Sequence, residues 1–387
     1  MSSASTDPAE FGVNPTSGFL PEIDPLDHLP TAFDAWEHVA QSLPKYLMSD
    51  RFRSIVDALP PFPTDCLCSA PQWERAMSLL SYLGHAYVWC GPQAATRVPA
   101  NLAVPWHAVA SRLGRPPVLS YASYCLHNWR RLEPERPVEV GNIALVQGFL
   151  GGEDEEWFVL IHVDIEAQAA PAMARLLDVQ AAVVVRDEET VMTHLSAVAT
   201  ALERVNATML RMIERCDPYI YFHRVRPYIH GWRNHPDIPQ GVVYEGVAEY
   251  EGRPQTFRGE TGAQSAIVPC LDAVLGVDHA PDELRTYLME MRTYMPPNHQ
   301  AFLAHLERGP KVREFVSKGG PALKKAYNAC IDEVEAFRSK HLEYAARYIF
   351  NQVQSDPKNP HDVGTGGTPF MPYLKKHRDE TREHEMR

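Results

Sequence analysis

The chain has 387 residues, and its 37 Lys and Arg against 49 Asp and Glu give a net charge of −12 at neutral pH. This length allows one large domain or two of ordinary size, since domains usually contain about 100–200 residues. Hydrophobic residues make up 45% of the chain, which is enough to bury a sizeable core and excludes a disordered or fibrous protein. The acidic balance argues against a nucleic-acid partner, because such proteins usually present a basic face.

The sequence shows no sign of secretion or of a membrane span. Seven scattered cysteines without a CxxC pair are typical of reduced thiols in a cytoplasmic protein. The N-terminal stretch is acidic and lacks the apolar core of a signal peptide, and the longest apolar runs are too short to cross a bilayer. We therefore expect a cytoplasmic protein, and the absence of an exposed heptad pattern favours a monomer.

The spacing of apolar residues predicts a protein built mostly of helices. Residues 1–30 are rich in Pro, Asp and Gly, which predicts an extended arm over the surface. Apolar residues then recur at intervals of three and four over 32–47 and 73–89, which predicts two amphipathic helices. Residues 118–132 follow two prolines and form a third helix candidate.

The segment from residue 142 to 177 has two interpretations. Two apolar stretches around a Gly-Gly-Glu-Asp turn favour a β-hairpin, whereas 157–177 equally fits a buried helix. Further along, the spacing predicts helices over 189–215, 281–295 and 321–354. Convincing strand patterns are few, so the predicted fold class is all-α.

His341 has a position on its predicted helix that suggests a special role. Tyr327, Cys330, Val334 and Phe337 precede it at intervals of three and four, so the pattern places His341 in the same buried stripe. A buried imidazole needs a hydrogen-bond partner or a metal. A core histidine bonded to a carbonyl or a carboxylate is the commoner outcome, but a helix that presents one histidine also suits a haem ligand.

Two other polar side chains lie in apolar or aromatic surroundings. His162 interrupts the apolar run 157–163, where a polar group is costly unless it is used. Arg226 lies among aromatic residues and suits bidentate recognition of a carboxylate, although an internal ion pair is the commoner use. The Gly-Thr run at 364–368 lacks the lysine of a phosphate loop and instead predicts a mobile loop.

Longer motifs occur in one order along nearly the whole chain: GFLPEIDPL, NLAVPW, RPYIHGWRNHP, MRTYMPPNHQAFLAHLE, FRSKHL and GTGGT. In these motifs the sequence resembles the indoleamine 2,3-dioxygenases, haem enzymes that open the indole ring of tryptophan. The resemblance implies a small N-terminal, mostly helical domain over 31–115 and a large helical haem-binding catalytic domain over 116–387. Haem b, ferrous in the active form, is expected between them.

The resemblance also implies roles for individual residues. His341 in FRSKHL matches the proximal haem-iron ligand, and Asp272 with Arg338 matches the pair that supports the proximal side. The catalytic group on the distal side is expected to include His162, Phe158 and Arg226. The residues expected to contact the substrate are Tyr121, Phe158, Tyr221, Phe222, Arg226, Thr261, Gly262 and Thr365.

His162 departs from the family pattern, because the mammalian enzymes carry a serine at this position. Tryptophan 2,3-dioxygenases, the sister family, use a histidine in their distal pocket. A histidine here accepts the indole N–H or donates to bound dioxygen, and it favours substrates with a free indole nitrogen.

Three hypotheses follow for the function. The first is a dioxygenase that uses O2 and an electron donor to convert L-tryptophan to N-formylkynurenine, the first step of the kynurenine pathway. The second is a haem-dependent oxygenase that acts on another indole derivative in secondary metabolism. The third is a haem-binding sensor with little turnover, which would need no group to bind a substrate carboxylate.

Overall fold

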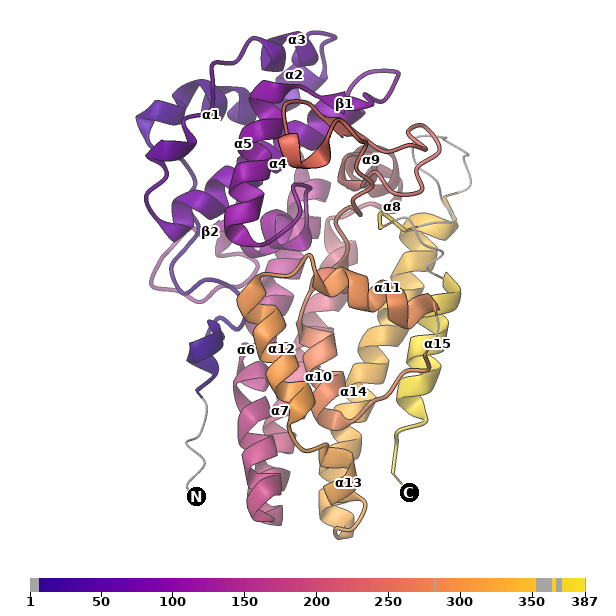
Figure 1. Cartoon of the computed structure of the whole chain (residues 1–387). Helices are drawn as coiled ribbons and strands as arrows, with labels where there is room; N and C mark the ends of the chain where they lie inside the picture. The colour runs from indigo at the N-terminus through magenta and orange to yellow at the C-terminus, as the bar shows by residue number, and fades with distance from the viewer. Residues whose placement is uncertain (1–6, 282, 353–363, 367–370, 387) are drawn as a thin grey trace.

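The computed structural model describes residues 7–281, 283–352, 364–366 and 371–386. Helices dominate the described residues, and the strands form only two short pairs, which confirms the predicted all-α class. The N-terminal helices gather at one end of the molecule, and the longest helices run from there to the opposite end (Figure 1).

The first described residues contain one short 3-10 helix, η1 (Pro8–Phe11), and no longer helix before residue 31. This part of the chain is irregular, as its composition predicts. It is not only a surface arm, however, because Val13, Phe19, Leu20 and Leu29 are buried. Its apolar side chains contribute to both hydrophobic cores of the molecule.

The N-terminal helices pack together, and most of α4, the longest of them, is buried. They are η2 (Thr31–Phe33), α1 (Asp34–Gln41), α2 (Leu43–Leu47), α3 (Phe52–Asp57), η3 (Thr64–Cys66), α4 (Ala70–Trp89) and α5 (Ala100–Leu113). The single helix predicted over 32–47 is divided in two, since Pro44 lies in the first turn of α2. Every residue of α4 from Arg75 to Trp89 is buried. The sequence predicts an amphipathic helix here, but the structure places most of this helix in the interior.

The close approach of α4 and α5 depends on a glycine. A Cβ atom built on Gly84 would lie 2.2 Å from the Trp106 ring of α5. The indole nitrogen of Trp106 also donates a hydrogen bond of 3.1 Å to Ser81 on α4. The absence of a side chain at Gly84 therefore sets the distance between these two helices.

The prediction of a helix over 118–132 is wrong. A short π-helix, η4 (Ala122–Leu126), is followed by strand β2 (Trp129–Arg131), which pairs in antiparallel fashion with β3 (Ile143–Leu145). The Asn128 side chain donates to the carbonyls of Tyr124 and Gln147 and accepts the Gln147 N–H. These bonds end the helical turn and tie it to the segment after β3.

Of the two interpretations of 142–177, the buried helix is correct over most of the segment. Helix α6 (Glu153–Val185) begins directly after the Gly-Gly pair and packs along α7 (Glu188–Leu210). The Glu155 carboxylate accepts the backbone N–H groups of Phe149, Leu150 and Gly151, which fixes the chain before α6.

The remaining helices and strands follow in chain order. They are η5 (Arg211–Glu214), α8 (Pro218–Ile220), η6 (Tyr221–Val225), α9 (Arg226–Ile229), β1 (Arg97–Val98) paired in parallel with β4 (Val243–Tyr244), η7 (Ala248–Tyr250), η8 (Gly262–Gln264), α10 (Ile267–Leu275), α11 (Glu283–Arg292), α12 (Pro297–Arg308), α13 (Val312–Val316), α14 (Pro321–Ala345), η9 (Ala346–Phe350) and α15 (Met371–Arg382). Helices α10, α12, α13 and α15 complete a helical bundle with α6, α7 and α14, whereas β1 and α9 contact α4 among the N-terminal helices (Figure 1).

The hydrophobic residues form two clusters. The first is built mainly from α1 to α5 and the segments around η4, and the second from α6, α7, α10, α12 and α14. Helix α6 contributes to both clusters. The domain boundary near residue 115 stays a prediction, since the first cluster continues to Phe149 and beyond.

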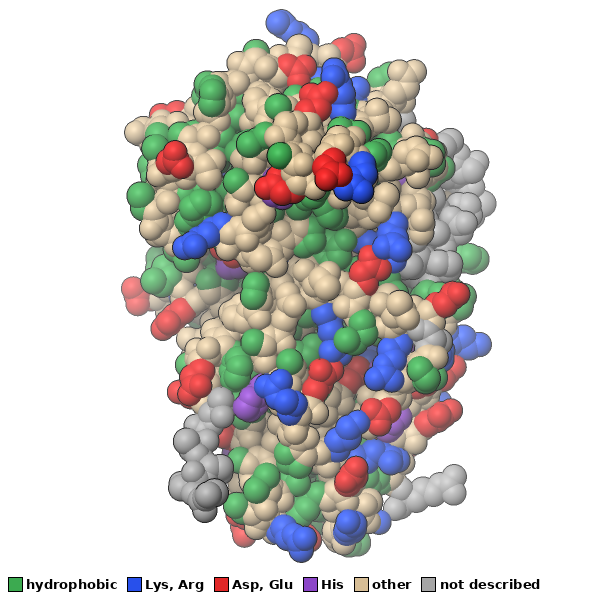
Figure 2. Space-filling view, in the orientation of Figure 1, with side chains coloured by type: hydrophobic (Ala, Val, Ile, Leu, Met, Phe, Trp, Pro, Cys, Tyr) green, Lys and Arg blue, Asp and Glu red, His purple; other side chains and the backbone are tan. Residues whose placement is uncertain are grey.

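On the face shown in Figure 2, Lys and Arg are interspersed with Asp and Glu. Such mixed charge is typical of a solvated protein surface. Among the described residues, no helix combines the length and the apolar character that a membrane crossing requires.

Replacement of Gly84 by Ala tests the packing of α4 on α5. The added methyl group collides with the Trp106 ring, so G84A is expected to lower the free energy of unfolding by about 1–3 kcal/mol. Urea denaturation of the holoprotein measures the change. The control G320A adds a methyl group in open space at φ −74°, and we expect a cost below about 1 kcal/mol. Equal urea midpoints for G84A and G320A would contradict the role of Gly84 in the packing of α4 on α5.

Candidate active site

Helix α6 presents Phe158 and His162 one turn apart on the same face. The Nδ1 atom of His162 lies 2.7 Å from the carbonyl oxygen of Phe158. A carbonyl oxygen only accepts, so Nδ1 carries the proton and Nε2 keeps its lone pair. Burial lowers the pKa of His162, which keeps the ring neutral. Nε2 makes no hydrogen bond with any described residue and is available as an acceptor.

Aromatic rings surround His162 on several sides. The Phe158 ring centroid lies 4.6 Å from that of His162 and 4.6 Å from that of Tyr221. Tyr121 meets His162 edge to face with centroids 6.1 Å apart. The structure thus brings together four of the predicted distal residues, from α6, η6 and the start of η4.

A buried carboxylate, Glu166, holds the Tyr121 side of this group. It lies one turn beyond His162 on α6 and accepts hydrogen bonds from the Tyr121 hydroxyl at 3.0 Å and from Ser265 at 2.7 Å. The Tyr121 backbone N–H also donates to the Gln264 side chain at 2.9 Å. Burial raises the pKa of Glu166 to about 7, although the two hydroxyl donors oppose this shift.

Arg226 begins α9 directly after the π-helix η6, which carries Tyr221 and Phe222. Short π-helical segments inside helices are frequent at functional sites. The Arg226 side chain is fully buried, and its guanidinium carbon lies 5.5 Å from the centre of the Phe222 ring. Burial raises the pKa of Tyr221, and the positive charge of Arg226 opposes this shift.

Thr261 and Gly262 lie at the start of η8, where the Thr261 hydroxyl accepts the N–H of Ala263. Of the predicted loop over 364–368, only residues 364–366 are among the described residues. The Thr365 hydroxyl donates to the carbonyl of Glu260, and the Thr365 carbonyl accepts the Gly231 N–H at 3.3 Å. The loop therefore contacts the segment that leads into η8.

His341 lies on α14, and its surroundings differ from those of an ordinary core histidine. Its side chain has an exposed accessible surface, yet desolvation by surrounding protein lowers its pKa to about 4, with a further contribution from His162. Both observations hold if the ring faces an enclosed space and not bulk solvent. The ring makes no hydrogen bond with a described residue. A neutral imidazole without a hydrogen-bond partner fits the donor chemistry of a haem ligand.

Behind His341, an ion pair connects α14 to α10. Arg338, one turn before His341, donates to Asp272 at 2.6 Å and also to Thr381 of α15. The ion pair lowers the pKa of Asp272, although burial acts in the opposite direction and is the larger single contribution. Three helices are thus fixed together on the side of α14 that the sequence predicts to support His341.

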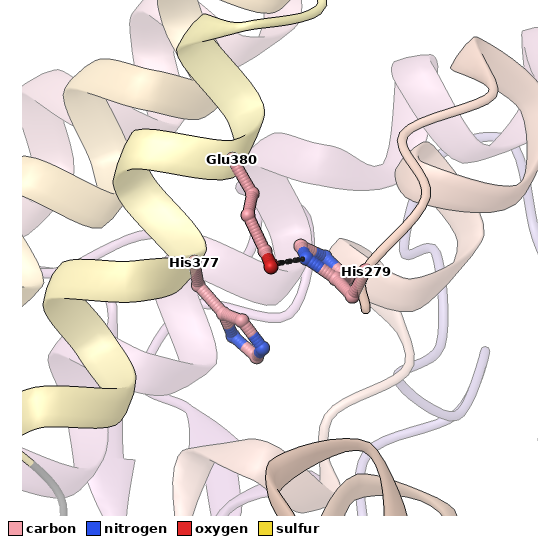
Figure 3. A group of neighbouring side chains, drawn as sticks. All are labelled: His279, His377 and Glu380. Carbon is pink, nitrogen blue, oxygen red and sulfur yellow. Dashed lines mark hydrogen bonds and ion pairs between the residues drawn. The ribbon is translucent and has the colours of Figure 1, made fainter. Parts of the chain in front are cut away.

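The same network extends to His279, His377 and Glu380 (Figure 3). His279 lies between two carboxylates, 2.6 Å from Glu380 and 3.2 Å from Asp272, and stacks on His377 with centroids 4.2 Å apart. Two histidines and a carboxylate are also the residue types of a metal site. The 2.6 Å separation is that of a hydrogen bond, however, since two ligands about 2.0–2.1 Å from a tetrahedral zinc ion lie further apart. We interpret the cluster as an anchor for α15.

The sequence analysis did not identify Glu166, Glu260 or His279 as site residues. Glu166 had a signal, because it follows His162 at an interval of four on the same helix face. Glu260 and His279 lie in irregular segments, where no periodic pattern indicates burial. Their surroundings depend on contacts between residues far apart in the sequence.

The all-α fold, with two neutral and unbonded imidazole nitrogens at His162 and His341, agrees with the class that the sequence predicts, the haem-dependent oxygenases. Residues 7–384 match the family model described as indoleamine 2,3-dioxygenase. The chain is 35% identical to indoleamine 2,3-dioxygenase 1 of Rattus norvegicus, over 97% of this chain and 94% of the relative. It is 31% identical to indoleamine 2,3-dioxygenase of Saccharomyces cerevisiae, over 96% and 92% of the two chains. It is also 30% identical to the 6-hydroxytryptophan 2,3-dioxygenase of Fusarium equiseti, over 99% of both.

The protein is therefore a dioxygenase, and the chain belongs to the indoleamine 2,3-dioxygenase family. This result confirms the resemblance on which the sequence analysis relied. The roles of the individual site residues stay predictions that the observed contacts support.

Replacement of Arg338 by Met tests the ion pair behind His341. R338M leaves the Asp272 carboxylate largely buried without its main counter-charge, so we expect a loss of about 3 kcal/mol in the free energy of unfolding. The control R175M removes an exposed pair with Asp178, whose expected contribution is below about 1 kcal/mol. Urea denaturation of both holoproteins makes the comparison, and equal losses would exclude a structural role for the Arg338 pair.

Proposed function

We propose that this protein opens the C2–C3 bond of the L-tryptophan indole with O2 and forms N-formylkynurenine, the first step of the kynurenine pathway. The observation that carries the proposal is the neutral His162, with Nε2 available and the rings of Phe158 and Tyr121 beside it, together with the unbonded imidazole of His341. Membership of the dioxygenase family supports it.

The cofactor in this proposal is haem b, ferrous in the working enzyme and held by His341. When bound, the haem supplies the iron that activates O2. Neutral imidazole is the form that binds iron, and the lowered pKa of His341 means that ligation requires no loss of a proton near neutral pH. An electron donor is required to keep the iron reduced.

The chain's own residues bind and orient the substrate. Arg226 receives the carboxylate, since a fully buried guanidinium favours an anionic partner with two oxygens. Phe158 and Tyr221 pack against the flat indole, and the Glu166 carboxylate keeps Tyr121 in position at the edge of the ring. Such positioning lowers the barrier because the reacting atoms are held in one orientation.

His162 accepts the indole N–H in this arrangement. The sequence leaves two roles open, acceptance of the indole N–H or donation to dioxygen. The hydrogen bond to the Phe158 carbonyl favours the first, since it uses the proton on Nδ1 and leaves a lone pair on Nε2.

Thr365 is proposed to cover the substrate when the 364–368 loop closes. Its hydroxyl and its carbonyl each bond a loop segment next to the site, which supports this placement. A covered site excludes water and strengthens the interactions with the charged substrate groups. Thr261 and Gly262 are proposed to line the same region.

One relative supports an alternative substrate for this protein. The 6-hydroxytryptophan 2,3-dioxygenase of Fusarium equiseti matches 99% of the chain, so a substituted tryptophan is the alternative substrate. A haem sensor is less consistent with the structure, because a sensor has no use for a buried arginine among aromatic rings. We further propose a cytoplasmic monomer.

The reaction is tested by reconstitution of the purified protein with haem, reduction, and addition of L-tryptophan and air. We expect a Soret band and a product two oxygen atoms heavier than tryptophan. H341A is expected to lose the Soret band, because the iron loses its ligand. A product with one added oxygen would support a different oxygenase, and a full Soret band in H341A would exclude His341 as the ligand.

The role of His162 is tested with 1-methyl-L-tryptophan, which lacks the indole N–H. The wild type is expected to prefer L-tryptophan, and H162A is expected to reduce the ratio of the two kcat/KM values by about tenfold or more, since the acceptor is lost. H223A, which replaces an aromatic-stacked histidine on η6, serves as a control. An unchanged ratio in H162A would exclude the acceptor role.

A further inference from the structure

A fully buried histidine on α4 connects two segments that carry candidate site residues. His85 is 0% exposed, and its Nδ1 atom lies 2.8 Å from the carbonyl oxygen of Tyr228 in α9. Its Nε2 atom lies 2.9 Å from the backbone nitrogen of Leu119, two residues before Tyr121. Helix α4 contacts both α9 and η4. One side chain therefore bridges the helix that begins with Arg226 and the segment that leads to Tyr121.

The two contacts of His85 require one form of its imidazole. The Tyr228 carbonyl only accepts, so Nδ1 carries the proton. The Leu119 N–H only donates, so Nε2 uses its lone pair as the acceptor. Burial lowers the pKa of His85 to about 3, so the ring stays neutral near neutral pH. Both nitrogens are thus bonded to backbone groups of the protein itself, and the ring fixes the distance between the two segments.

Aromatic rings on and around α4 confine this bridge. The His85 ring centroid lies 4.7 Å from that of Trp232 and 6.3 Å from that of Trp106. Trp89 follows His85 by one turn, and its indole nitrogen donates to the carbonyl of His230 at 3.0 Å. The last carbonyls of a helix have no partner within the helix. Two side chains of α4 therefore supply donors to carbonyls at the C-terminal end of α9.

The segments that His85 bridges also meet through the distal rings. The π-helix η6, which begins with Tyr221, continues directly into α9 at Arg226. Tyr221 packs on Phe158 with ring centroids 4.6 Å apart. His162 connects Phe158 to Tyr121 through centroid distances of 4.6 and 6.1 Å. The two segments are thus held relative to each other by the rings of α6 and, independently, by the bridge from α4.

We propose that His85, supported by Trp89, is a positioning residue that fixes Arg226 and Tyr121 relative to each other and so sets the preference of the site for indoles that carry a carboxylate. This inference rests on the proposed function, in which Arg226 receives the carboxylate and Tyr121 lies at the edge of the indole ring. A helix as short as α9 has little stability of its own, so the bonds from α4 decide where it lies. Displacement of a positioning group by about 1 Å can lower a rate by about 100-fold.

Two conservative variants separate the two hydrogen bonds of His85. The amide of H85N reaches the place of Nδ1 and donates to Tyr228, but it leaves the Leu119 N–H without its acceptor. The longer amide of H85Q reaches the place of Nε2 and accepts from Leu119, but it leaves the Tyr228 carbonyl without its donor. H85Q therefore releases α9, whereas H85N releases the segment before Tyr121.

The effect on specificity is measured by titration of the full-length holoprotein with L-tryptophan and with tryptamine, which lacks the carboxylate. The Soret shift gives both dissociation constants. We expect H85Q to weaken L-tryptophan by about 3- to 10-fold and to change tryptamine by less than about twofold, because only L-tryptophan uses Arg226. H85N should weaken both ligands alike, because both contain the indole ring beside Tyr121. Equal effects of H85Q on the two ligands would show a general loss of packing and overturn the proposal.

Hydrogen exchange tests the bridge without any ligand. In the holoprotein, the Leu119 amide should exchange at the wild-type rate in H85Q and about tenfold or more faster in H85N, because H85N removes its acceptor. Equal exchange of this amide in the two variants would overturn the bridge.

A variant of Trp89 keeps the proposal testable if the His85 variants do not fold. W89F retains a ring and removes the donor to the His230 carbonyl. It should lower the preference for L-tryptophan over tryptamine in the same direction as H85Q. An unchanged preference in W89F would overturn the role of the α4 contacts in specificity.

Turnover separates this inference from the proposed function. Normal turnover of L-tryptophan by the wild type, with an unchanged preference in H85Q, contradicts only the role of His85. The expected binding pattern without a product two oxygen atoms heavier contradicts only the dioxygenase reaction.

Discussion

The burial of helix α6 on two sides is the constraint on which the site depends. Leu160 and Val163 belong to the first hydrophobic cluster, and Ile161 and Ile165 belong to the second. A helix packed on both sides has little freedom to rotate about its axis, because rotation would expose one apolar set. The direction of His162 is therefore set by hydrophobic packing far more extensive than the site itself.

The site places polar groups in a largely desolvated interior, and their environments divide them into two kinds. Glu166 and Asp272 are bonded to neighbouring side chains, so they hold Tyr121 and α14 in position. The His162 Nε2 has no bonded partner among the described residues. The bonded groups form a rigid frame, whereas the unbonded nitrogen is the group on which a ligand can act.

The sequence predicts the elements in which one periodic pattern dominates, and α4 and α7 agree with their predicted helices to within about five residues. The helix predicted from residue 321 begins there as α14, which ends at Ala345 and continues as the π-helix η9 to Phe350. The prediction fails over 118–132, where the side chain of Asn128 bonds backbone groups on two segments and replaces a helix by η4 and β2. The apolar stripe and the aromatic surroundings single out His341 and Arg226, and the resemblance to a family gives them their expected roles. Neither the patterns nor the resemblance supplies Glu260, whose burial results from the packing of residues around 229–231 against 258–260, a contact between distant parts of the chain.

Two polar groups of the site, the His162 imidazole and the Arg226 guanidinium, complement one class of molecule. A neutral imidazole nitrogen accepts an N–H, and a buried guanidinium favours an anion with two oxygens. Tryptophan carries both an indole N–H and a carboxylate on one flat ring system. In the proposed arrangement, the contact at the carboxylate and the hydrogen bond at the indole nitrogen together restrict the orientation of the C2–C3 bond. Since the cofactor supplies the oxygen chemistry, this control of orientation is what the chain itself contributes to the reaction.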